Sequence, residues 1–219
     1  MHYDVCGHII RSEYAAKTTM CPNKIVAKYI CSIPSGAMVL DYGCGKLRHT
    51  ILASSNDRIV IGIDSKRQLS LKQTIQGQSC TIVSYAERNL PNVKIYDLED
   101  VRWRTSQYDR ILCNNVLSAI PYVQDRYIVL ENIQRQLHCD GEALISVQYR
   151  NSYFKQYHER TDIQQYQDGW IIPLKHYFTF YGIIMPADLE KMFEDVGLET
   201  ISSQKKDGSV YFIVKRRNR

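Results

Sequence analysis

The sequence lacks several features that mark whole classes of protein. Its seven cysteines are odd in number and scattered, and no two of them form a Cys-x-x-Cys pair. This absence argues against zinc or redox chemistry, so we expect reduced, buried thiols and no metal site. The chain also contains no internal repeat and no low-complexity segment, which argues against a repeat architecture.

Long apolar segments are missing from the start of the chain. The first twenty residues carry charges at Asp4, Arg11, Glu13 and Lys17 and contain no long apolar core. The sequence therefore predicts neither a secretory signal nor a membrane span. We expect a cytoplasmic location and no membrane partner.

The chain has little net charge outside the C-terminal tail. The formal net charge is +5, of which Lys215, Arg216, Arg217 and Arg219 supply four, so the rest of the chain is close to neutral. A basic stripe across the fold would favour nucleic acid, whereas a short basic tail is typical of a solvated end. With 219 residues and 44% hydrophobic residues, the chain is expected to form one domain with a packed core and an insertion.

Apolar clusters alternate with amphipathic stretches along most of the chain. This alternation predicts an α/β fold in which helices connect parallel strands. One predicted helix covers about 23–30 and has Asn23 as its cap, a second covers 47–53, a third starts at a Ser65 cap, and a fourth covers 125–137. The predicted strands are 37–40, 59–63, 93–96, 108–113 and 143–147. The segment 77–90 fits a strand or a helix equally well.

The C-terminal part predicts a different arrangement. Pro186 suits the first turn of a helix that reaches Val196, where Gly197 can end it. Two strand-like runs then flank Asp207-Gly208, and both residues tolerate the positive φ of a tight hairpin turn. We therefore expect the sheet to end in an antiparallel pair.

The most informative segment is the run from Val39 to Lys46, a buried strand that leads through Gly43-Cys-Gly45 into a helix. The two glycines allow a sharp turn and a close approach of a ligand to the backbone. The following helix offers free N–H groups at its start. A tight strand-to-helix turn without a ligand would explain the same pattern.

Polar residues lie at the ends of four successive predicted strands, and Asp41 is the one that follows the first strand. Asp64 ends the second strand 19 residues after Gly45, where a carboxylate can bind both hydroxyls of a ribose; a helix cap is the alternative role. Asp97 follows the third strand, and Asn114 and Asn115 follow the fourth. Because ligands bind at the carboxyl ends of the strands in open α/β sheets, the four positions together predict a binding site.

From about Asn23 to Val214, the sequence resembles the class I S-adenosylmethionine-dependent methyltransferases. The segment Asp41-Tyr-Gly-Cys-Gly looks like their glycine-rich loop, and Ile61-Gly-Ile-Asp64 looks like their ribose-binding second strand. The resemblance implies a Rossmann-like, doubly wound, seven-stranded sheet, mostly parallel with a C-terminal antiparallel hairpin. It also implies S-adenosylmethionine as the cofactor and methyl transfer as the reaction.

The resemblance assigns roles to particular residues. Besides Asp41 in the loop, Gly43 and Gly45 would face the methionine part of the cofactor, and Asp64 would bind the ribose hydroxyls. Asp97 and the Leu98 amide would contact the adenine, and Asn114 would lie beside the sulfonium. Many relatives carry a third glycine where this chain has Leu47. A nicotinamide-binding loop fits less well, because its third glycine would fall on Arg48.

The segment 149–185 is the predicted acceptor side of the site. It holds ten of the chain's 23 aromatic residues. We assign acceptor binding to Tyr149, Tyr153, Trp170 and Tyr177, whereas a lid packed on its own aromatic side chains is the alternative. His176 is the candidate general base, with an ordinary surface histidine as the alternative. His49 is expected on a helix surface near the cofactor loop.

Some acceptors are argued against by missing motifs. Enzymes that methylate an exocyclic amine of a DNA base usually carry Asn or Asp before Pro-Pro and an aromatic residue, but residues 114–117 read Asn-Asn-Val-Leu. The Pro-Cys nucleophile of cytosine-C5 enzymes is also missing. We expect a small-molecule acceptor. RNA is an alternative, since aromatics are interleaved with Arg150, Lys155, Arg160 and Lys175; a non-catalytic protein that binds the cofactor is a third.

Overall fold

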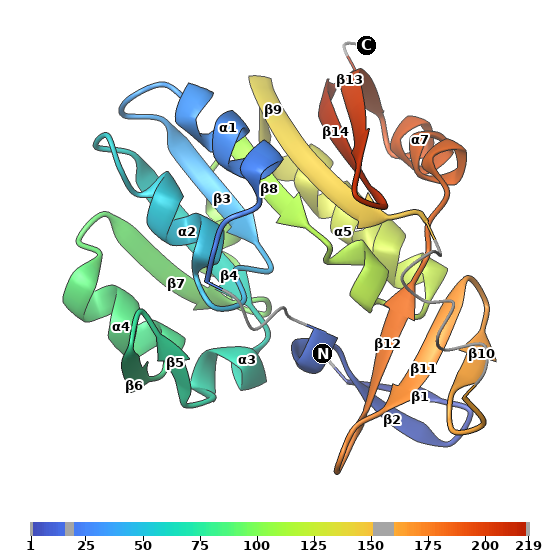
Figure 1. Cartoon of the computed structure of the whole chain (residues 1–219). Helices are drawn as coiled ribbons and strands as arrows, with labels where there is room; N and C mark the ends of the chain where they lie inside the picture. The colour runs from blue at the N-terminus through green and yellow to red at the C-terminus, as the bar shows by residue number, and fades with distance from the viewer. Residues whose placement is uncertain (1, 16–19, 151–159, 218–219) are drawn as a thin grey trace. The chain divides into compact units, whose positions relative to one another are not determined.

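The computed structural model describes residues 2–15, 20–150 and 160–217. The chain divides into two compact units: unit 1 comprises Met1–Ala15, Asn114–Arg135 and Ile145–Arg219, and unit 2 comprises Ala16–Cys113 and Gln136–Leu144. The strands form one seven-stranded, one five-stranded and one two-stranded sheet (Figure 1). Tyr153, one of the predicted acceptor-binding residues, lies outside the described residues.

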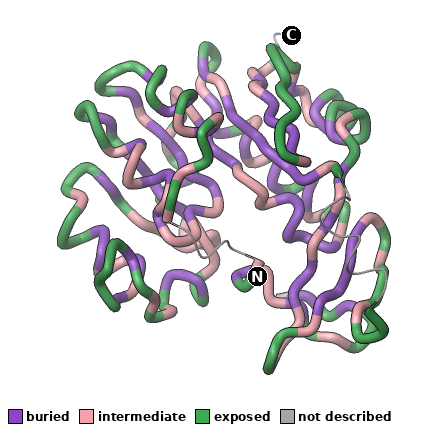
Figure 2. Tube along the Cα trace, viewed as in Figure 1, coloured by how far each residue is buried: buried purple, intermediate pink, exposed green. Residues whose placement is uncertain are grey.

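Unit 2 contains the parallel strands that the apolar runs predicted. They are β3 (Met38–Tyr42), β4 (Ile59–Asp64), β7 (Val93–Asp97) and β8 (Tyr108–Asn114). Strand β3 pairs in parallel with β4 and β8, and β4 pairs in parallel with β7. The central apolar side chains of β3, β4 and β8 are buried, whereas in β7, at the edge of the sheet, only Val93 is buried; buried residues are purple in Figure 2. Strands buried on both faces read as continuous apolar runs, which is why the sequence located them.

Among the described residues of unit 2, helices α1 (Lys24–Ser32), α3 (Lys66–Ser70) and α4 (Ile82–Asn89) begin at side-chain caps, whereas α2 (Arg48–Ala53) follows Leu47 and has none. The side chains of Asn23, Ser65 and Thr81 accept hydrogen bonds from the first free N–H groups of α1, α3 and α4. The ambiguous segment 77–90 contains both structures, because β6 (Gln78–Cys80) forms a hairpin with β5 (Gln73–Ile75) before α4 begins.

The seven-stranded sheet has the order β13-β14-β9-β8-β3-β4-β7. Its three strands from the C-terminal part of the chain are β9 (Leu137–Gln148), β13 (Leu198–Lys206) and β14 (Ser209–Arg216). Helix α5 (Val123–Gln136) precedes β9, and helix α7 (Pro186–Asp195) precedes β13. Strands β13 and β14 pair antiparallel around Asp207 and Gly208, whose φ angles are 49° and 76°. The predicted seven-stranded sheet with its terminal hairpin is therefore confirmed.

A second sheet in unit 1 was not predicted. The N-terminal strands β1 (His2–Val5) and β2 (His8–Arg11) join β12 (Phe178–Gly182), β11 (Gly169–Pro173) and β10 (Gln164–Tyr166). Strands β2 and β12 run parallel, with Ile10 opposite Phe178. Three short 3-10 turns complete the described elements: η1 (Ser12–Ala15), η2 (Val101–Thr105) and η3 (Leu117–Ala119).

A buried ion pair attaches the five-stranded sheet to α5. Arg126 is 1% exposed, and its two terminal nitrogens donate to the two carboxylate oxygens of Asp168, which lies in the turn between β10 and β11. Its Nε also donates to the Ile120 carbonyl at 2.9 Å. A Cβ at Gly182 in β12 would lie 2.9 Å from the guanidinium, so any larger residue there would displace the Arg126 side chain. The pair thus fixes the sheet against the helix within unit 1.

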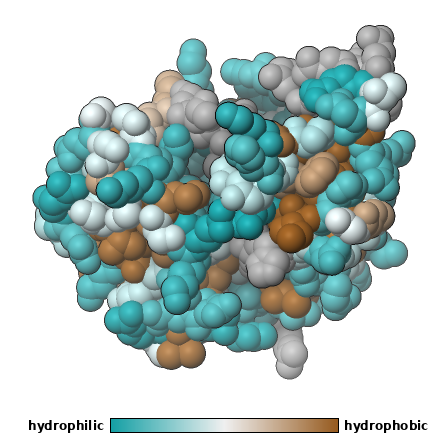
Figure 3. All heavy atoms as spheres, turned by 90° about the horizontal axis from the view of Figure 1, so that it is seen from below, coloured by the Kyte–Doolittle hydropathy of each residue, from teal (hydrophilic) through white to brown (hydrophobic). Residues whose placement is uncertain are grey.

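The cysteines are divided between the interior and the surface. All seven cysteines are free thiols, but only Cys44, Cys80 and Cys113 are buried. The expectation that the thiols are buried is therefore wrong for the other four. On the face drawn in Figure 3, outside the grey residues, hydrophobic side chains form small separate groups on a mostly hydrophilic surface. Among the described residues, no helix is both long enough and apolar enough to cross a membrane.

Replacing Asp168 with Asn should destabilise unit 1 strongly. The change leaves the Arg126 charge buried without its counter-charge, a loss that typically costs about 3 kcal/mol or more. The cost should fall at the low end of that range, because the Asp168 side chain is 33% exposed. Urea unfolding measures it. Asp162→Asn is the matched control, because its partner Arg160 is 45% exposed and the expected loss is under about 1 kcal/mol. Equal effects of the two variants would contradict the prediction.

Candidate active site

The glycine loop that follows β3 crosses the end of β4. Gly43 and Gly45 have φ angles of 78° and 54°, in the left-handed region that favours glycine. The N–H groups of Gly43 and Cys44 both donate to the Ile63 carbonyl, at 2.9 and 3.0 Å. Gly62 permits this close crossing, because a Cβ there would lie 2.8 Å from the Ile95 side chain and 3.3 Å from the Cys44 Cβ.

Leu47, where the resemblance to methyltransferases would allow a third glycine, adopts a backbone conformation that favours glycine. Its φ of 63° and ψ of 17° are left-handed, and its side chain is fully buried. A left-handed conformation costs a non-glycine residue roughly 1–2 kcal/mol. Burial of a leucine side chain contributes a comparable stabilisation, about 1.5–3 kcal/mol. The loop therefore keeps the glycine-like backbone despite the substitution.

The Asp64 carboxylate holds both the loop and the start of α3. Its Oδ2 accepts from the Gly45 N–H at 2.8 Å, and its Oδ1 accepts from the Ser65 N–H at 2.7 Å. The side-chain cap of α3 is Ser65, whose hydroxyl accepts from the Gln68 N–H. The predicted alternative of Asp64 as the helix cap is therefore wrong, and the carboxylate instead lies beside the loop.

Asp97 lies next to Asp64 at the ends of neighbouring strands. The two residues are paired in the parallel register of β4 and β7. Oδ1 of Asp97 accepts from the N–H groups of Glu99 and Asp100, at 2.8 and 3.1 Å, so this residue also shapes the turn after β7. The Leu98 N–H donates to the Asp64 carbonyl at 3.0 Å. The Leu98 amide therefore already has a backbone acceptor. The contact of this amide with adenine stays a prediction.

Asp41 is a buried carboxyl beneath the loop. It is 2% exposed and accepts a 2.6 Å hydrogen bond from the Thr50 hydroxyl. Burial raises the pKa of Asp41 to about 6; the Thr50 hydrogen bond opposes this increase, and the nearby Asp64 charge adds to it. Burial beside these carboxylates also raises the pKa of the Cys44 thiol well above its usual range. The thiol is therefore a poor nucleophile.

His49 is buried, contrary to the predicted place on a helix surface. It is 6% exposed, and burial together with the Arg48 charge lowers its pKa to about 3. The short helix α2 turns this side chain toward the interior, together with Thr50. A buried neutral imidazole is a packing residue of unit 2.

Asn114 is the last residue of β8 and Asn115 follows it, and both belong to unit 1. Oδ1 of Asn114 accepts from the Ser146 hydroxyl at 3.2 Å, whereas its Nδ2 is buried with no hydrogen-bond partner among the described residues. Asn115 has a left-handed φ of 58°, and its N–H donates to the Ser146 carbonyl at 2.8 Å. The buried Nδ2 of Asn114 is a donor that a ligand could use.

The predicted acceptor residues lie in different surroundings within unit 1. Trp170 is 6% exposed and packs with Ile172 in a small hydrophobic cluster that includes Tyr181. Tyr149 is half-buried, its N–H donates to the Gly208 carbonyl at 3.0 Å, and Lys205 lies over its ring. Trp170 therefore packs within the five-stranded sheet. Such packing fits the alternative interpretation of this segment, a lid packed on its own aromatic side chains.

Tyr177 contacts Tyr14 and Arg11 of the N-terminal segment, a contact that the sequence did not predict. Its ring stacks on Tyr14 at 5.4 Å between centroids and 11° between planes, and the Arg11 guanidinium lies 4.3 Å from its centroid. The only signal for this contact is tertiary, because about 160 residues separate the two segments. His176 is exposed between β11 and β12 and touches the Tyr177 ring edge-on.

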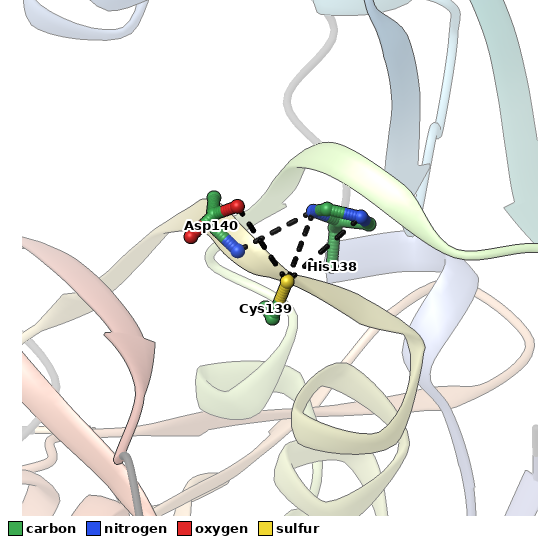
Figure 4. Close-up of side chains that lie close together, drawn as sticks. All are labelled: His138, Cys139 and Asp140. Atoms are coloured by element: carbon green, nitrogen blue, oxygen red, sulfur yellow. Dashed lines mark hydrogen bonds between the residues drawn. The ribbon is translucent and has the colours of Figure 1, made fainter.

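One group of possible metal ligands occurs among the described residues. His138, Cys139 and Asp140 are consecutive near the start of β9, and their side chains lie close together in Figure 4. The Cys139 Sγ lies 3.6 Å from both the His138 Nδ1 and the Asp140 Oδ2. Three neighbouring, mostly exposed residues provide fewer than the four ligands of a structural zinc site. We therefore assign no metal to them.

Comparison with known proteins identifies the family. A family model described as a methyltransferase domain matches residues 11–203, and the chain belongs to this methyltransferase family. The Escherichia coli (strain K12) protein described as uncharacterized protein YmfD is 36% identical over 214 residues, which cover 98% of this chain and 96% of that protein.

Solved structures share the fold at low sequence identity. The 1,6-didemethyltoxoflavin-N1-methyltransferase of Burkholderia thailandensis, solved with 1,6-didemethyltoxoflavin and S-adenosylhomocysteine, has a TM-score of 0.62 at 16% identity, over 94% of this chain and 81% of that one. The PH0226 protein of Pyrococcus horikoshii OT3 has a TM-score of 0.70 at 13% identity, over 95% and 100% of the two chains. These likenesses establish the methyltransferase-type α/β fold.

Replacing Asp41 with Asn should change how stability depends on pH. The unfolded carboxyl has a pKa near 3.8 and the folded one a pKa of about 6, so between these values the folded chain binds more protons and the free energy of unfolding falls as the pH rises. Asn has no such proton. The stability of Asp41→Asn relative to the wild type should therefore increase by roughly 2 kcal/mol between pH 4 and pH 7.

Urea unfolding at a series of pH values measures this difference. Comparing the variant with the wild type at each pH cancels other titrating groups, including His49, whose lowered pKa gives the opposite slope. A difference that stays constant with pH would contradict the assignment of a raised pKa to Asp41.

Proposed function

We propose that the chain is an S-adenosylmethionine-dependent methyltransferase that acts on a small-molecule acceptor. The observation that carries the proposal is the arrangement at the strand ends of unit 2. There the Asp64 carboxylate binds the Gly45 amide and lies in register with Asp97. Glycine backbone and paired carboxylates at the carboxyl ends of parallel strands suit a nucleoside ligand.

The residues of unit 2 fit the proposed cofactor. The left-handed Gly43 and Gly45 present backbone without side chains, and the Asp64 carboxylate beside them is an acceptor group that suits ribose hydroxyls. Asp41, Asp64 and Asp97 also make the potential of this edge negative, which suits a cationic sulfonium. When bound, S-adenosylmethionine supplies an activated methyl group. The neighbouring structures solved with S-adenosylmethionine or S-adenosylhomocysteine support this choice.

In this proposal, unit 1 supplies the acceptor side. Asn114 would contribute its buried Nδ2 near the sulfonium end of the cofactor, and Tyr149, Tyr153, Trp170 and Tyr177 would contact the acceptor. His176 is retained as the candidate general base, since an exposed imidazole can exchange protons with water. An acceptor whose nucleophile already carries a lone pair needs mainly positioning, so the base is required only for a weaker nucleophile.

The charges of the chain favour a small acceptor over RNA. Arg160, one of the four basic residues that suggested RNA, forms a hydrogen-bonded ion pair with Asp162 at 2.6–2.9 Å. Arg150 and Lys175 are exposed. Pairing of a basic residue within the chain reduces what it contributes to phosphate binding. The Burkholderia neighbour, which was solved with a small heterocyclic compound, also supports a small acceptor.

Replacing Asp64 with Ala should weaken binding of S-adenosylhomocysteine. The variant loses charge-assisted hydrogen bonds worth about 1.5–3 kcal/mol, which corresponds to roughly 10- to 100-fold in affinity. Isothermal titration calorimetry measures the affinity, and circular dichroism checks that the variant is folded. Asp140→Ala, an exposed position on β9, is the matched control and should bind as the wild type does. Unchanged affinity of Asp64→Ala would remove this carboxylate from the site.

Incubation with methyl-labelled S-adenosylmethionine should distinguish the candidate functions. We expect label to enter the low-molecular-weight fraction of a cell extract and not purified total RNA. Label in RNA that falls steeply with rising salt would favour the RNA enzyme, because neutralised phosphates release counterions. Measurable affinity for the cofactor without transfer to either fraction would favour the non-catalytic binding protein.

A further inference from the structure

Asp41 is enclosed by the elements of unit 2 that carry the glycine loop. It lies in β3 between two neighbouring parallel strands, opposite Gly62 of β4 and Leu112 of β8. Its side chain accepts a hydrogen bond from Thr50 of α2, and the residue is 2% exposed. The loop begins two residues later with Gly43. This buried carboxyl group therefore lies next to the backbone that the proposed cofactor would contact.

The charged and titratable groups that act on Asp41 come from β4, α2, β8 and the loop. The Asp64 charge at the end of β4 disfavours its ionised form, and the Arg48 charge at the start of α2 favours it. The Cys44 thiol in the loop and the Cys113 thiol in β8 also interact with it, and burial raises the pKa of both thiols well above the usual range. Since both thiols stay neutral, the charge beneath the loop depends on the protonation of Asp41.

Burial makes the protonation of Asp41 sensitive to a ligand. Removal from water raises the pKa of Asp41 to about 6, against the opposing effect of the Thr50 hydrogen bond. His49, which precedes Thr50 in α2, stays neutral in this range because burial lowers its pKa to about 3. A cation bound at the loop favours the ionised carboxylate, since opposite charges attract more strongly in the interior than in water.

We propose that Asp41 makes the site selective for the cationic cofactor over its neutral product. The ionised carboxylate attracts the sulfonium of S-adenosylmethionine, whereas the sulfur of S-adenosylhomocysteine carries no charge. Protonation of Asp41 removes this preference. The inference rests on the proposed function, because it concerns the cofactor and the product of that methyl transfer.

Methyl transfer changes the charge that Asp41 detects. The acceptor's lone pair forms the new bond to the methyl carbon, and the electron pair of the broken carbon–sulfur bond stays on sulfur. The sulfonium charge therefore disappears, and near pH 6 the carboxylate takes up a proton from water in response. At higher pH Asp41 stays ionised, so the site holds S-adenosylmethionine more tightly than S-adenosylhomocysteine and the product leaves more readily.

Isothermal titration calorimetry with each of the two compounds measures this preference. In the wild type, we expect the preference for S-adenosylmethionine to be about tenfold larger at pH 7.5 than at pH 5. Asp41→Asn should remove the pH dependence, because the amide does not ionise. Asp57→Asn, at an exposed position of unit 2, is the matched control and should keep it. The same pH dependence in Asp41→Asn and in the wild type would overturn the proposal.

Proton release gives a second measurement, which does not require a variant of Asp41. Calorimetry at pH 6 in buffers of different ionisation enthalpy yields the number of protons that binding releases. Because the pKa of Asp41 is about 6, this group is half protonated before binding, and S-adenosylmethionine should release about half a proton more than S-adenosylhomocysteine. Equal release by the two compounds would contradict the proposal.

A variant of Thr50 keeps the test available if Asp41→Asn does not fold. Thr50→Val removes the hydrogen bond that favours the ionised carboxylate. The pH at which the preference for S-adenosylmethionine appears should therefore rise by about one unit. A preference that appears at the wild-type pH in this variant would show that Asp41 is not the titrating group.

Binding itself separates this inference from the proposed function. If both compounds bind and their relative affinity does not change with pH, the selectivity assigned to Asp41 is wrong while the methyltransferase proposal stands. If neither compound binds, the proposed function fails.

Discussion

The double hydrogen bond of the Asp64 carboxylate is the interaction on which the candidate site depends. One oxygen binds the Gly45 amide and the other the Ser65 amide, so a single side chain connects the glycine loop after β3 to the start of α3. Without it, two amides at the sheet edge would lose their acceptor, and the loop would lose its contact with the second strand. The same carboxylate stands next to Asp97, which makes this edge suitable for an adenosine-like ligand.

The glycine loop contains a strained backbone conformation and lies above a buried carboxyl group, and both are next to the candidate site. Leu47 adopts a left-handed conformation while its side chain is fully buried, and Asp41 remains a carboxyl in the interior beside Thr50. Each arrangement lowers stability and is retained where the surrounding strands hold it in place. Perturbed acids of this kind are typical of functional sites. Membership of the methyltransferase family gives the arrangement its most direct explanation.

Unit 1 is held together by contacts between segments far apart in the sequence. Arg126 binds Asp168, and Ile10 pairs with Phe178, so the N-terminal hairpin and the aromatic-rich segment form one sheet. The sequence predicted the segment 149–185 alone as the acceptor side. In the structure, the Tyr14 ring stacks on Tyr177 of this segment, and the Arg11 guanidinium lies over the same ring.

The sequence by itself determined the strands of the seven-stranded sheet and, outside the ambiguous segment 77–90, its main helices and their caps, together with the order of its glycine loop and acidic strand ends. These features are local: a buried strand is a continuous apolar run, Asn23 and Ser65 cap helices through neighbouring amides, and Asp207-Gly208 tolerates positive φ. Only the tertiary structure decided the burial of His49, the second sheet and the contact of Arg11 with Tyr177. Short strands such as β1 and β10 carry too few residues for a periodic pattern, and their pairing depends on distant partners that no local pattern reveals.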